Sequence, residues 1–407
     1  MEWKEVRLGD VCEIYGRIGF RGYTTNDLVD TPKEGAISLS PKNIINGELN
    51  LDQCTYIKWD KYYESPEIMI NPNEIIITKT GSSVGRTTFV RRVDHPMTLN
   101  PQLVVLKNIS ENAEFLSYYI KSALFQSVLK SIVVGSAIPT LSQKNLANLK
   151  INVPKEVDDQ RRIASILSSL DRKIELNNKI NADLEEMAQA IFKNRFVDFE
   201  PFKDGKFVDS ELGMIPEGWK VGRLTEIASY MNGLAMQKFP PENNEDSLPV
   251  LKIKELGQGF CGTDSDRCSC NIKDECKIHN GDVIFSWSGT LLVDVWCGGD
   301  CGLNQHLFKV TSKDYPKWFY YYWTKHHLQE FIHIAKDKAV TMGHIKRGHL
   351  EEAMVAIPDN DSMEKAHELF EPILSKMISL RLENSRLSLL RDTLLPRLMS
   401  GELEVPE

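Results

Sequence analysis

A helical stretch that occurs twice is the feature that most limits what this chain can fold into. Residues 158–197 carry apolar residues at helical spacing without Gly or Pro, and residues 362–400 have the same apolar spacing. The positions at which the two stretches match, among them Met187 and Leu390, are three or four residues apart. This spacing is typical of helices that pack along their length. If residues 158–197 are all helix, they span roughly 60 Å. The predicted seam contains Leu167, Leu170, Ile174, Asn181, Leu184, Met377, Leu380, Asn384 and Leu387.

Two equivalent helices in one chain pair most simply about a pseudo-two-fold axis, which makes them antiparallel. In that arrangement Asn181 and Asn384 lie near the crossing point. A buried Asn in such a seam costs stability but fixes the register of the two helices. The alternative is that both Asn side chains face solvent at the edge of the seam.

Composition and charge narrow the class of protein. The chain is 42% hydrophobic and 26% charged, as in a globular protein. No apolar run approaches the ~18 residues that cross a membrane. Because residues 1–10 are too polar for a signal peptide, we expect a cytoplasmic protein. The net charge of −8 argues against indiscriminate nucleic-acid binding, but it leaves room for a local basic surface.

The cysteines crowd into the second half of the chain. Cys261, Cys268, Cys270 and Cys276 lie close together in sequence, and His279 follows them. In a cytosolic chain such a cluster suggests a structural zinc ion before a disulfide. The spacing lacks the paired CxxC motif of common zinc sites, so free thiols are the favoured interpretation and no metal is predicted.

The segments in front of the two helices repeat each other in order. Residues 220–233 resemble residues 4–16, residues 279–290 resemble residues 72–81, and residues 303–310 resemble residues 99–106. A linker with Gly and Pro, residues 211–219, separates the halves. We therefore predict an α+β fold. Its parts are a first domain at 1–157, a long helix at 158–198, a second domain at 199–360, and a long helix with a tail at 361–407.

Three phrases together resemble the specificity subunit of type I restriction–modification systems. They are AQAIFKNRFVDFEPF at 188–202, LGMIPEGW at 212–219 and LLPRLMSGELEVPE at 394–407. The resemblance covers essentially the whole chain. It implies two pseudo-two-fold-related target recognition domains that each read half of a split sequence in double-stranded DNA. It also implies an antiparallel pair of long coiled-coil helices that separates these domains and docks two methyltransferase subunits, with a restriction subunit in some complexes.

Candidate DNA-contacting residues lie in turns and loops of both halves. A Gly/Ser loop beside basic residues suits a phosphate, and amide side chains read adenine edges. The stretch from Lys325 to His349, which includes Lys338, is expected to form one phosphate-facing surface. The alternative for each residue is a solvated loop. The candidates are Arg17, Arg21, Ser40, Lys42, Asn43, Lys79, Ser82, Ser83, Arg86, Asn100, Gln102, Lys252, Lys254, Asn304, Gln305, His306, His344, Lys346 and Arg347.

An enzymatic function is not favoured by the motifs. The nearest matches to the Asn/Asp-Pro-Pro-aromatic motif of DNA methyltransferases are residues 71–73 and 100–102, and both lack the second Pro and the aromatic residue. We therefore predict a non-catalytic recognition subunit without its own cofactor, with S-adenosylmethionine expected on the partner subunit. The alternatives are a self-contained DNA modification enzyme and a coiled-coil scaffold without DNA specificity.

Overall fold

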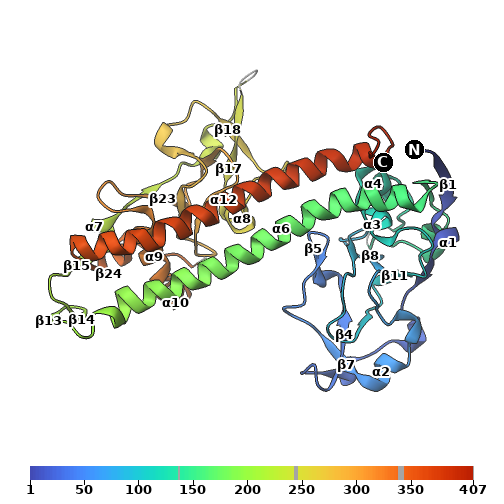
Figure 1. The fold of residues 1–407 in the computed structure, drawn as a ribbon, viewed down its shortest axis with the longest axis horizontal. Helices are drawn as coiled ribbons and strands as arrows, with labels where there is room; N and C mark the ends of the chain where they lie inside the picture. The colour runs from blue at the N-terminus through green and yellow to red at the C-terminus, as the bar shows by residue number, and fades with distance from the viewer. Residues whose placement is uncertain (136–137, 243–245, 338–342, 407) are drawn as a thin grey trace. The chain divides into compact units, whose positions relative to one another are not determined.

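Two long helices connect two compact units. The computed structural model describes residues 1–135, 138–242, 246–337 and 343–406. Unit 1 comprises Met1–Arg172 and Leu387–Glu407, and unit 2 comprises Lys173–Arg386. The helices α6 (Val157–Phe192) and α12 (Asn360–Met399), green and red in Figure 1, each contribute residues to both units. Over the described ranges, no helix is both long and apolar enough to cross a membrane.

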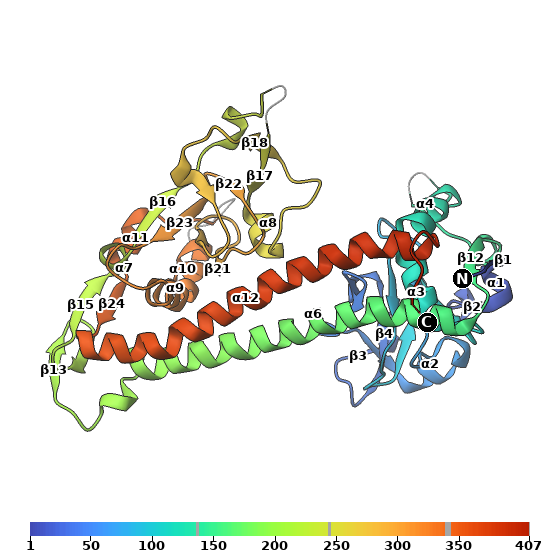
Figure 2. The same cartoon turned by 45° about the horizontal axis from the view of Figure 1, so that its top comes forward.

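The helices α6 and α12 are antiparallel, as predicted. In unit 2, Asn177 of α6 contacts Asn384 of α12 at 2.8 Å, and the rings of Phe192 and Phe370 lie 6.2 Å apart. Rising residue numbers in α6 therefore meet falling numbers in α12. Figure 2 shows the two helices side by side in a second view.

The polar contact in the helix seam differs from the predicted pair. The Asn384 side chain accepts a hydrogen bond from Asn177 and donates one to Asn178, each at 2.8 Å. Asn181 is 8% exposed, and neither atom of its amide has a hydrogen-bond partner among the described residues. Asn181 is therefore buried rather than solvent-facing, one helical turn beyond the residue that Asn384 contacts.

The apolar side chains of the helix seam differ in how far they are buried. Met187 and Leu390 share the spacing but are 44% and 47% exposed, so they lie outside the packed seam. Those on the inside are the buried Leu167, Met377 and Leu380 and the half-buried Leu170, Ile174, Leu184 and Leu387.

Unit 1 is built from two small sheets and short helices. Residues of β8 (Ile75–Thr78) and β11 (Leu103–Lys107) alternate between two apolar cores, since Ile75 and Ile77 belong to one core and Ile76 to the other. One sheet has the order β2 (Glu13–Tyr15), β11 (Leu103–Lys107), β8 (Ile75–Thr78), β9 (Thr87–Phe89). The other has the order β10 (Met97–Leu99), β4 (Gly35–Leu39), β7 (Tyr56–Lys58), β3 (Leu28–Val29), with β10 and β4 parallel.

Further pairs and helices complete unit 1. A hairpin at Asn46-Gly47 forms only between two-residue strands, because the preceding strand β4 pairs with β10 and β7 instead. The remaining elements are β1 (Trp3–Arg7) paired with β12 (Lys150–Pro154), β5 (Ile44–Ile45) paired with β6 (Glu48–Leu49), α1 (Leu8–Val11), α2 (Trp59–Tyr63), α3 (Ala113–Lys121), α4 (Ala123–Ser131) and α5 (Gln143–Ala147).

Unit 2 repeats this plan, as the sequence repeat predicts. Its first sheet has the order β16 (Ser229–Asn232), β23 (Leu307–Thr311), β20 (Val283–Ser286), β21 (Leu292–Val295). Its second has the order β18 (Arg267–Ser269), β17 (Ser247–Leu251), β22 (Cys301–Leu303), β19 (Lys277–Ile278), with β17 and β22 parallel. The other elements are β13 (Phe207–Ser210) with β14 (Gly213–Pro216), β15 (Lys220–Arg223) with β24 (Met354–Ile357), α7 (Leu224–Ile227), α8 (Ile253–Gln258), α9 (Lys317–His326), α10 (Leu328–Asp337) and α11 (Arg347–Glu352).

The core of unit 2 is continuous with the long helices. The aromatic residues of α9 are buried, and Trp318 stacks on Phe370 of α12 with ring centroids 4.6 Å apart. Phe192 of α6 joins the same cluster. Each long helix therefore supplies side chains to this core instead of resting on its surface.

None of the cysteines, all of which lie in the described ranges, forms a disulfide. Cys268 and Cys276 are buried in a small apolar cluster with Met236, Val250 and Ile272. Across the described part of the chain, no three His, Cys, Asp or Glu side chains lie close enough together to hold a metal ion.

Candidate nucleic-acid interface

A turn that occurs once in each unit carries several of the predicted residues. It follows β10 in unit 1 and β22 in unit 2, and an Asn stands first in both. The backbone N–H of Asn100 donates to Leu39 at 2.8 Å, and that of Asn304 donates to Leu251 at 3.1 Å. In both turns the Asn side-chain oxygen accepts the backbone N–H two residues later, from Gln102 at 2.9 Å and from His306 at 3.2 Å.

This hydrogen bonding makes the Asn a structural residue in both units. Asn100 is 9% exposed and Asn304 is 8% exposed. An Asn side chain that bonds the backbone two residues ahead stabilises a turn of this kind. The side chains at the next two positions, residues 101–102 and 305–306, are less buried than the Asn. Gln102 is exposed, and Gln305 and His306 are half-buried.

Two further segments lie beside the turn in each unit. The residues after β8 pair with the segment before α5, where Leu141 donates its N–H to Lys79 at 2.7 Å. The residues after β20 pair in the same way with the segment before α11, where Ile345 donates its N–H to Trp287 at 3.0 Å. Thus three loops that are distant in sequence meet at one place in each unit.

In unit 1 the three loops line a hollow, and in unit 2 the turn that begins at Asn304 lines another. The hollow of unit 1 has a volume of about 450 Å³ and is lined by residues 79–80, 101–102 and 140–143. The hollow of unit 2 has a volume of about 770 Å³ and is lined by residues 236–237, 250, 252–254, 266–267 and 304–306. Both hollows lie at the same turn of a repeated fold.

Lys79 gives the hollow of unit 1 a positive charge. Its side chain is half-buried, and burial lowers its pKa. No ion pair of Lys79 with a carboxylate is found among the described residues, whereas both lysines that line the second hollow are paired. Lys252 pairs with Asp266, and Lys254 pairs with Asp264 at 2.6 Å.

Two predicted DNA contacts are structural residues instead. Arg17 is 4% exposed, and its guanidinium donates to the Leu99 carbonyl at 2.8 Å and to the Thr98 hydroxyl at 3.1 Å. Asn43 is 2% exposed; its side-chain oxygen accepts the Ser40 N–H at 3.0 Å, and its amide donates to the Asn50 carbonyl at 3.1 Å. Burial and internal hydrogen bonds remove both side chains from the surface.

The other candidates of unit 1 lie outside the hollow. The half-buried Arg21 forms an ion pair with Glu67 at 3.4 Å, and the half-buried Ser40 donates from its hydroxyl to Asn43 at 3.0 Å. The Gly/Ser loop is a tight turn in which Arg86 donates its N–H to the Ser83 carbonyl at 3.0 Å. Lys42, Ser82 and Arg86 are exposed, and Ser83 is half-buried.

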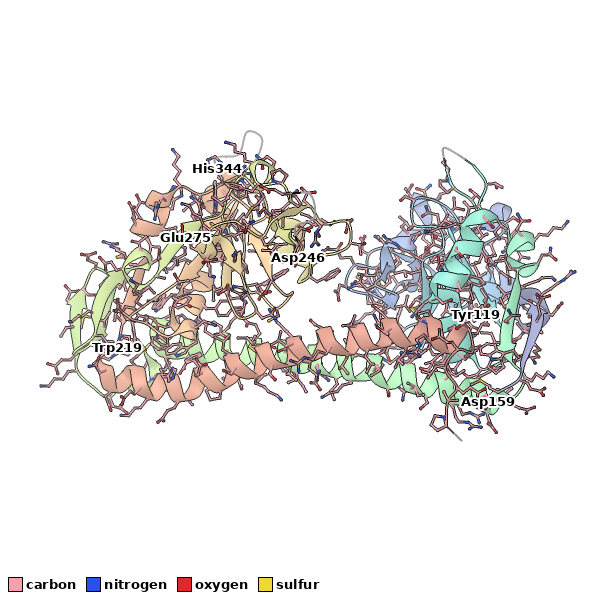
Figure 3. The ribbon with its side chains drawn as sticks, turned by 90° about the horizontal axis from the view of Figure 1, so that it is seen from above. Tyr119, Asp159, Trp219, Asp246, Glu275 and His344 are labelled. Atoms are coloured by element: carbon pink, nitrogen blue, oxygen red, sulfur yellow. The ribbon has the colours of Figure 1, made fainter. Side chains whose placement is uncertain are left out.

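The stretch from Lys325 to His349 does not form one surface. Lys325 contacts Glu185 of α6 at 2.5 Å, and the neighbouring His326 has a pKa lowered by burial. Figure 3 shows His344 on the side of unit 2 away from the long helices. Lys338 lies outside the described residues. Whereas Lys325 of α9 contacts α6, His344 pairs with Ser288 after β20, and His344, Lys346 and Arg347 are all exposed.

Two parts of the site were not predicted from the sequence, namely Trp287 and the segment at 140–143. Trp287 occupies the place in unit 2 that Lys79 occupies in unit 1, and its ring centroid lies 5.9 Å from that of His306. Trp287 could have been found by aligning the repeats at 72–81 and 279–290. Residues 140–143 have no comparable signal, because polar loop residues precede many helices.

Comparisons with known proteins identify the family. The family model described as the type I restriction modification DNA specificity domain matches residues 1–186 and 216–384. The chain is 28% identical over 425 residues to the specificity subunit of the type I restriction enzyme MjaIX of Methanocaldococcus jannaschii, covering 100% of this chain and 94% of that protein. It is 22% identical over 470 residues to the HindI specificity subunit of Haemophilus influenzae, covering 99% and 100% respectively.

A solved structure supports the fold. The crystal structure of the S subunit of a type I restriction–modification system from M. genitalium matches with a TM-score of 0.54 at 16% identity, covering 98% of this chain and 96% of that chain. The family model covers the greater part of both halves of the sequence. The chain belongs to the family of DNA specificity subunits of type I restriction–modification systems.

Proposed function

We propose that each unit reads one half of a bipartite target in double-stranded DNA. The observation that carries this proposal is the turn and hollow that recur in both units with different side chains. Direct readout of a base requires polar side chains on a rigid support at the surface. A repeated support with different exposed residues is what two readers of different sequences require.

The helices α6 and α12 are proposed to set the distance between the half-sites and to dock two methyltransferase subunits. Several apolar side chains on these helices are exposed, among them Leu389 at 70% and Leu176 at 52%. Exposed apolar residues of this size favour contact with another protein. A restriction subunit is a further expected partner of the methylating complex.

The subunit is proposed to be non-catalytic and cytoplasmic. Neither hollow brings together a nucleophile, a base and a cofactor loop of the kind that a self-contained methyltransferase needs. The chemistry, together with S-adenosylmethionine, is assigned to the partner subunit. Purified chain without that partner is expected to transfer no methyl groups.

Mapping of methylated bases in cells that express this chain with its methyltransferase tests the proposal. We expect one bipartite sequence with an unread spacer. Methylation without sequence preference would support a scaffold without DNA specificity, and methylation by the isolated chain would support a self-contained enzyme.

Insertion of one heptad into both helices tests the role of the helix pair. The insertion lengthens the pair by about 10 Å, which corresponds to about three base pairs. We expect a changed spacer between unchanged half-sites. An unaltered spacer would contradict this role of the helices.

A further inference from the structure

The hydrogen bonds of the turn in unit 1 determine which groups Gln102 offers to a ligand. The Asn100 side-chain oxygen already accepts the backbone N–H of Gln102, so its Nδ2 is the group that faces the Gln102 side chain. That Nδ2 donates to Gln102 Oε1 at 3.2 Å. The Gln102 oxygen therefore accepts a hydrogen bond inside the turn, and its NH₂ group is the part of the amide that can donate to a ligand.

Two side chains that line the hollow of unit 1, Gln102 and Lys79, present hydrogen-bond donors. Gln102 Nε2 offers two N–H groups, and the ammonium of Lys79, which lines the same hollow, can only donate. In the major groove, guanine offers two acceptors side by side, N7 and O6, whereas adenine offers one acceptor and one donor. The donors of Gln102 and Lys79 therefore favour guanine.

The hollow of unit 2 presents a mixed pattern. Gln305 Nε2 lies 3.3 Å from His306 Nε2, and His306 Nδ1 lies 3.1 Å from the Ser288 hydroxyl. When Gln305 donates to His306, its Oε1 and its second N–H stay available. An amide that offers one donor and one acceptor matches the N6 and N7 groups of adenine. The lysines of this hollow are already paired with Asp264 and Asp266.

We propose that Gln102, together with Lys79, reads a guanine in the half-site of unit 1, and that Gln305 reads an adenine in the half-site of unit 2. Asn100 and Asn304 are positioning residues, because they orient these readers without facing the DNA. This inference rests on the proposed function, since it assigns base types to readers that the proposal places at the two hollows.

Replacement of Gln102 by Glu reverses the hydrogen-bonding character of the reader at nearly constant shape. A carboxylate only accepts, so it favours the N4 amino group of cytosine or the N6 amino group of adenine. The experiment maps methylated sites for Gln102→Glu and Gln305→Glu, each expressed with the methyltransferase. Gln53→Glu is the matched control, because Gln53 is an exposed residue of unit 1 outside the hollow.

We expect Gln102→Glu to lose the preference for guanine at one position of one half-site and to leave the other half-site unchanged. Gln305→Glu should lose the preference for adenine in the other half-site, and Gln53→Glu should methylate the original sequence. If either hollow variant keeps every base preference of the unsubstituted protein, the inference is overturned, while a bipartite target would still support the proposed function. If the unsubstituted complex shows no bipartite target, the proposed function itself fails.

If a variant complex transfers no methyl groups, its affinity for DNA is measured instead. The purified complex is titrated with duplexes in which each guanine of the target is replaced in turn by 7-deazaguanine, which lacks the N7 acceptor. One guanine should show about a tenfold loss of affinity with Gln102 in place. The same replacement should change binding by the Gln102→Ala complex by less than about twofold. Equal losses in both complexes would overturn the inference.

Discussion

Replacing Phe370 by Ala tests whether α12 is an integral part of unit 2. Phe370 is fully buried. Its ring stacks on Trp318 at 4.6 Å with an interplanar angle of 12°, and it lies 6.2 Å from the rings of Phe192 and Phe196. Truncating a buried Phe removes its transfer free energy and leaves a cavity, at a cost of about 3–5 kcal/mol. Because rings from α6 and α9 line that cavity, we expect a loss near the middle of this range, about 4 kcal/mol.

Urea unfolding followed by tryptophan fluorescence measures this loss. Unit 2 contains five of the seven tryptophans of the chain, so the signal reports mainly on this unit; they are Trp219, Trp287, Trp296, Trp318 and Trp323. A lower midpoint at an unchanged slope gives the change in the free energy of unfolding.

The matched control is Phe260→Ala, because Phe260 lies in the same unit and is 53% exposed. Its effect should stay within about 0.5 kcal/mol. A loss below about 1 kcal/mol for Phe370→Ala would refute the reasoning, since a helix lying loosely on the surface of unit 2 would tolerate this truncation.

Three further changes have directions that follow from the structure. Asn181→Leu replaces a buried amide without partners among the described residues, so it should raise the free energy of unfolding by about 1–3 kcal/mol in the same urea assay; a loss would show that the amide is satisfied. Burial raises the pKa of Cys12 to about 12 from the usual 9.0, so ionisation of this thiol should destabilise the fold progressively from pH 9 to 12. Mass spectrometry after treatment with iodoacetamide at pH 8 should show Cys54 modified before Cys12. Replacing the exposed Lys346 and Arg347 by Ala should flatten the slope of log affinity for DNA against log salt concentration by about 2; an unchanged slope would mean that neither side chain contacts a phosphate.

The internal repeat made the architecture predictable from one sequence. Two copies of one pattern gave two similar units and an antiparallel helix pair, because equal seams in one chain pack best when they face each other. The register was harder to predict. Asn384 contacts Asn177 and Asn178 rather than Asn181, and a difference of one helical turn leaves the apolar spacing almost unchanged.

Residue type alone was a poor guide to which polar side chains reach the surface. Arg17 lies in a turn-rich stretch like those that contact DNA, yet its donors are used by Leu99 and Thr98 inside unit 1. These acceptors lie 81 or more positions away in sequence. No local pattern predicts such a contact, because it depends on the sheet that brings β10 beside the opening loop.

The recurring turn divides structural from recognition roles between neighbouring residues. The Asn and two backbone hydrogen bonds stabilise the turn in each unit, so the folding free energy depends little on the side chains at the next two positions. Those positions hold Pro101 and Gln102 in one unit and Gln305 and His306 in the other. Because the turn persists while these residues differ, a change of recognised base requires no change of fold. The same arrangement explains why the position of the reading surface was visible in the sequence repeat, whereas its hydrogen-bonding pattern required the coordinates of Asn100 and Ser288.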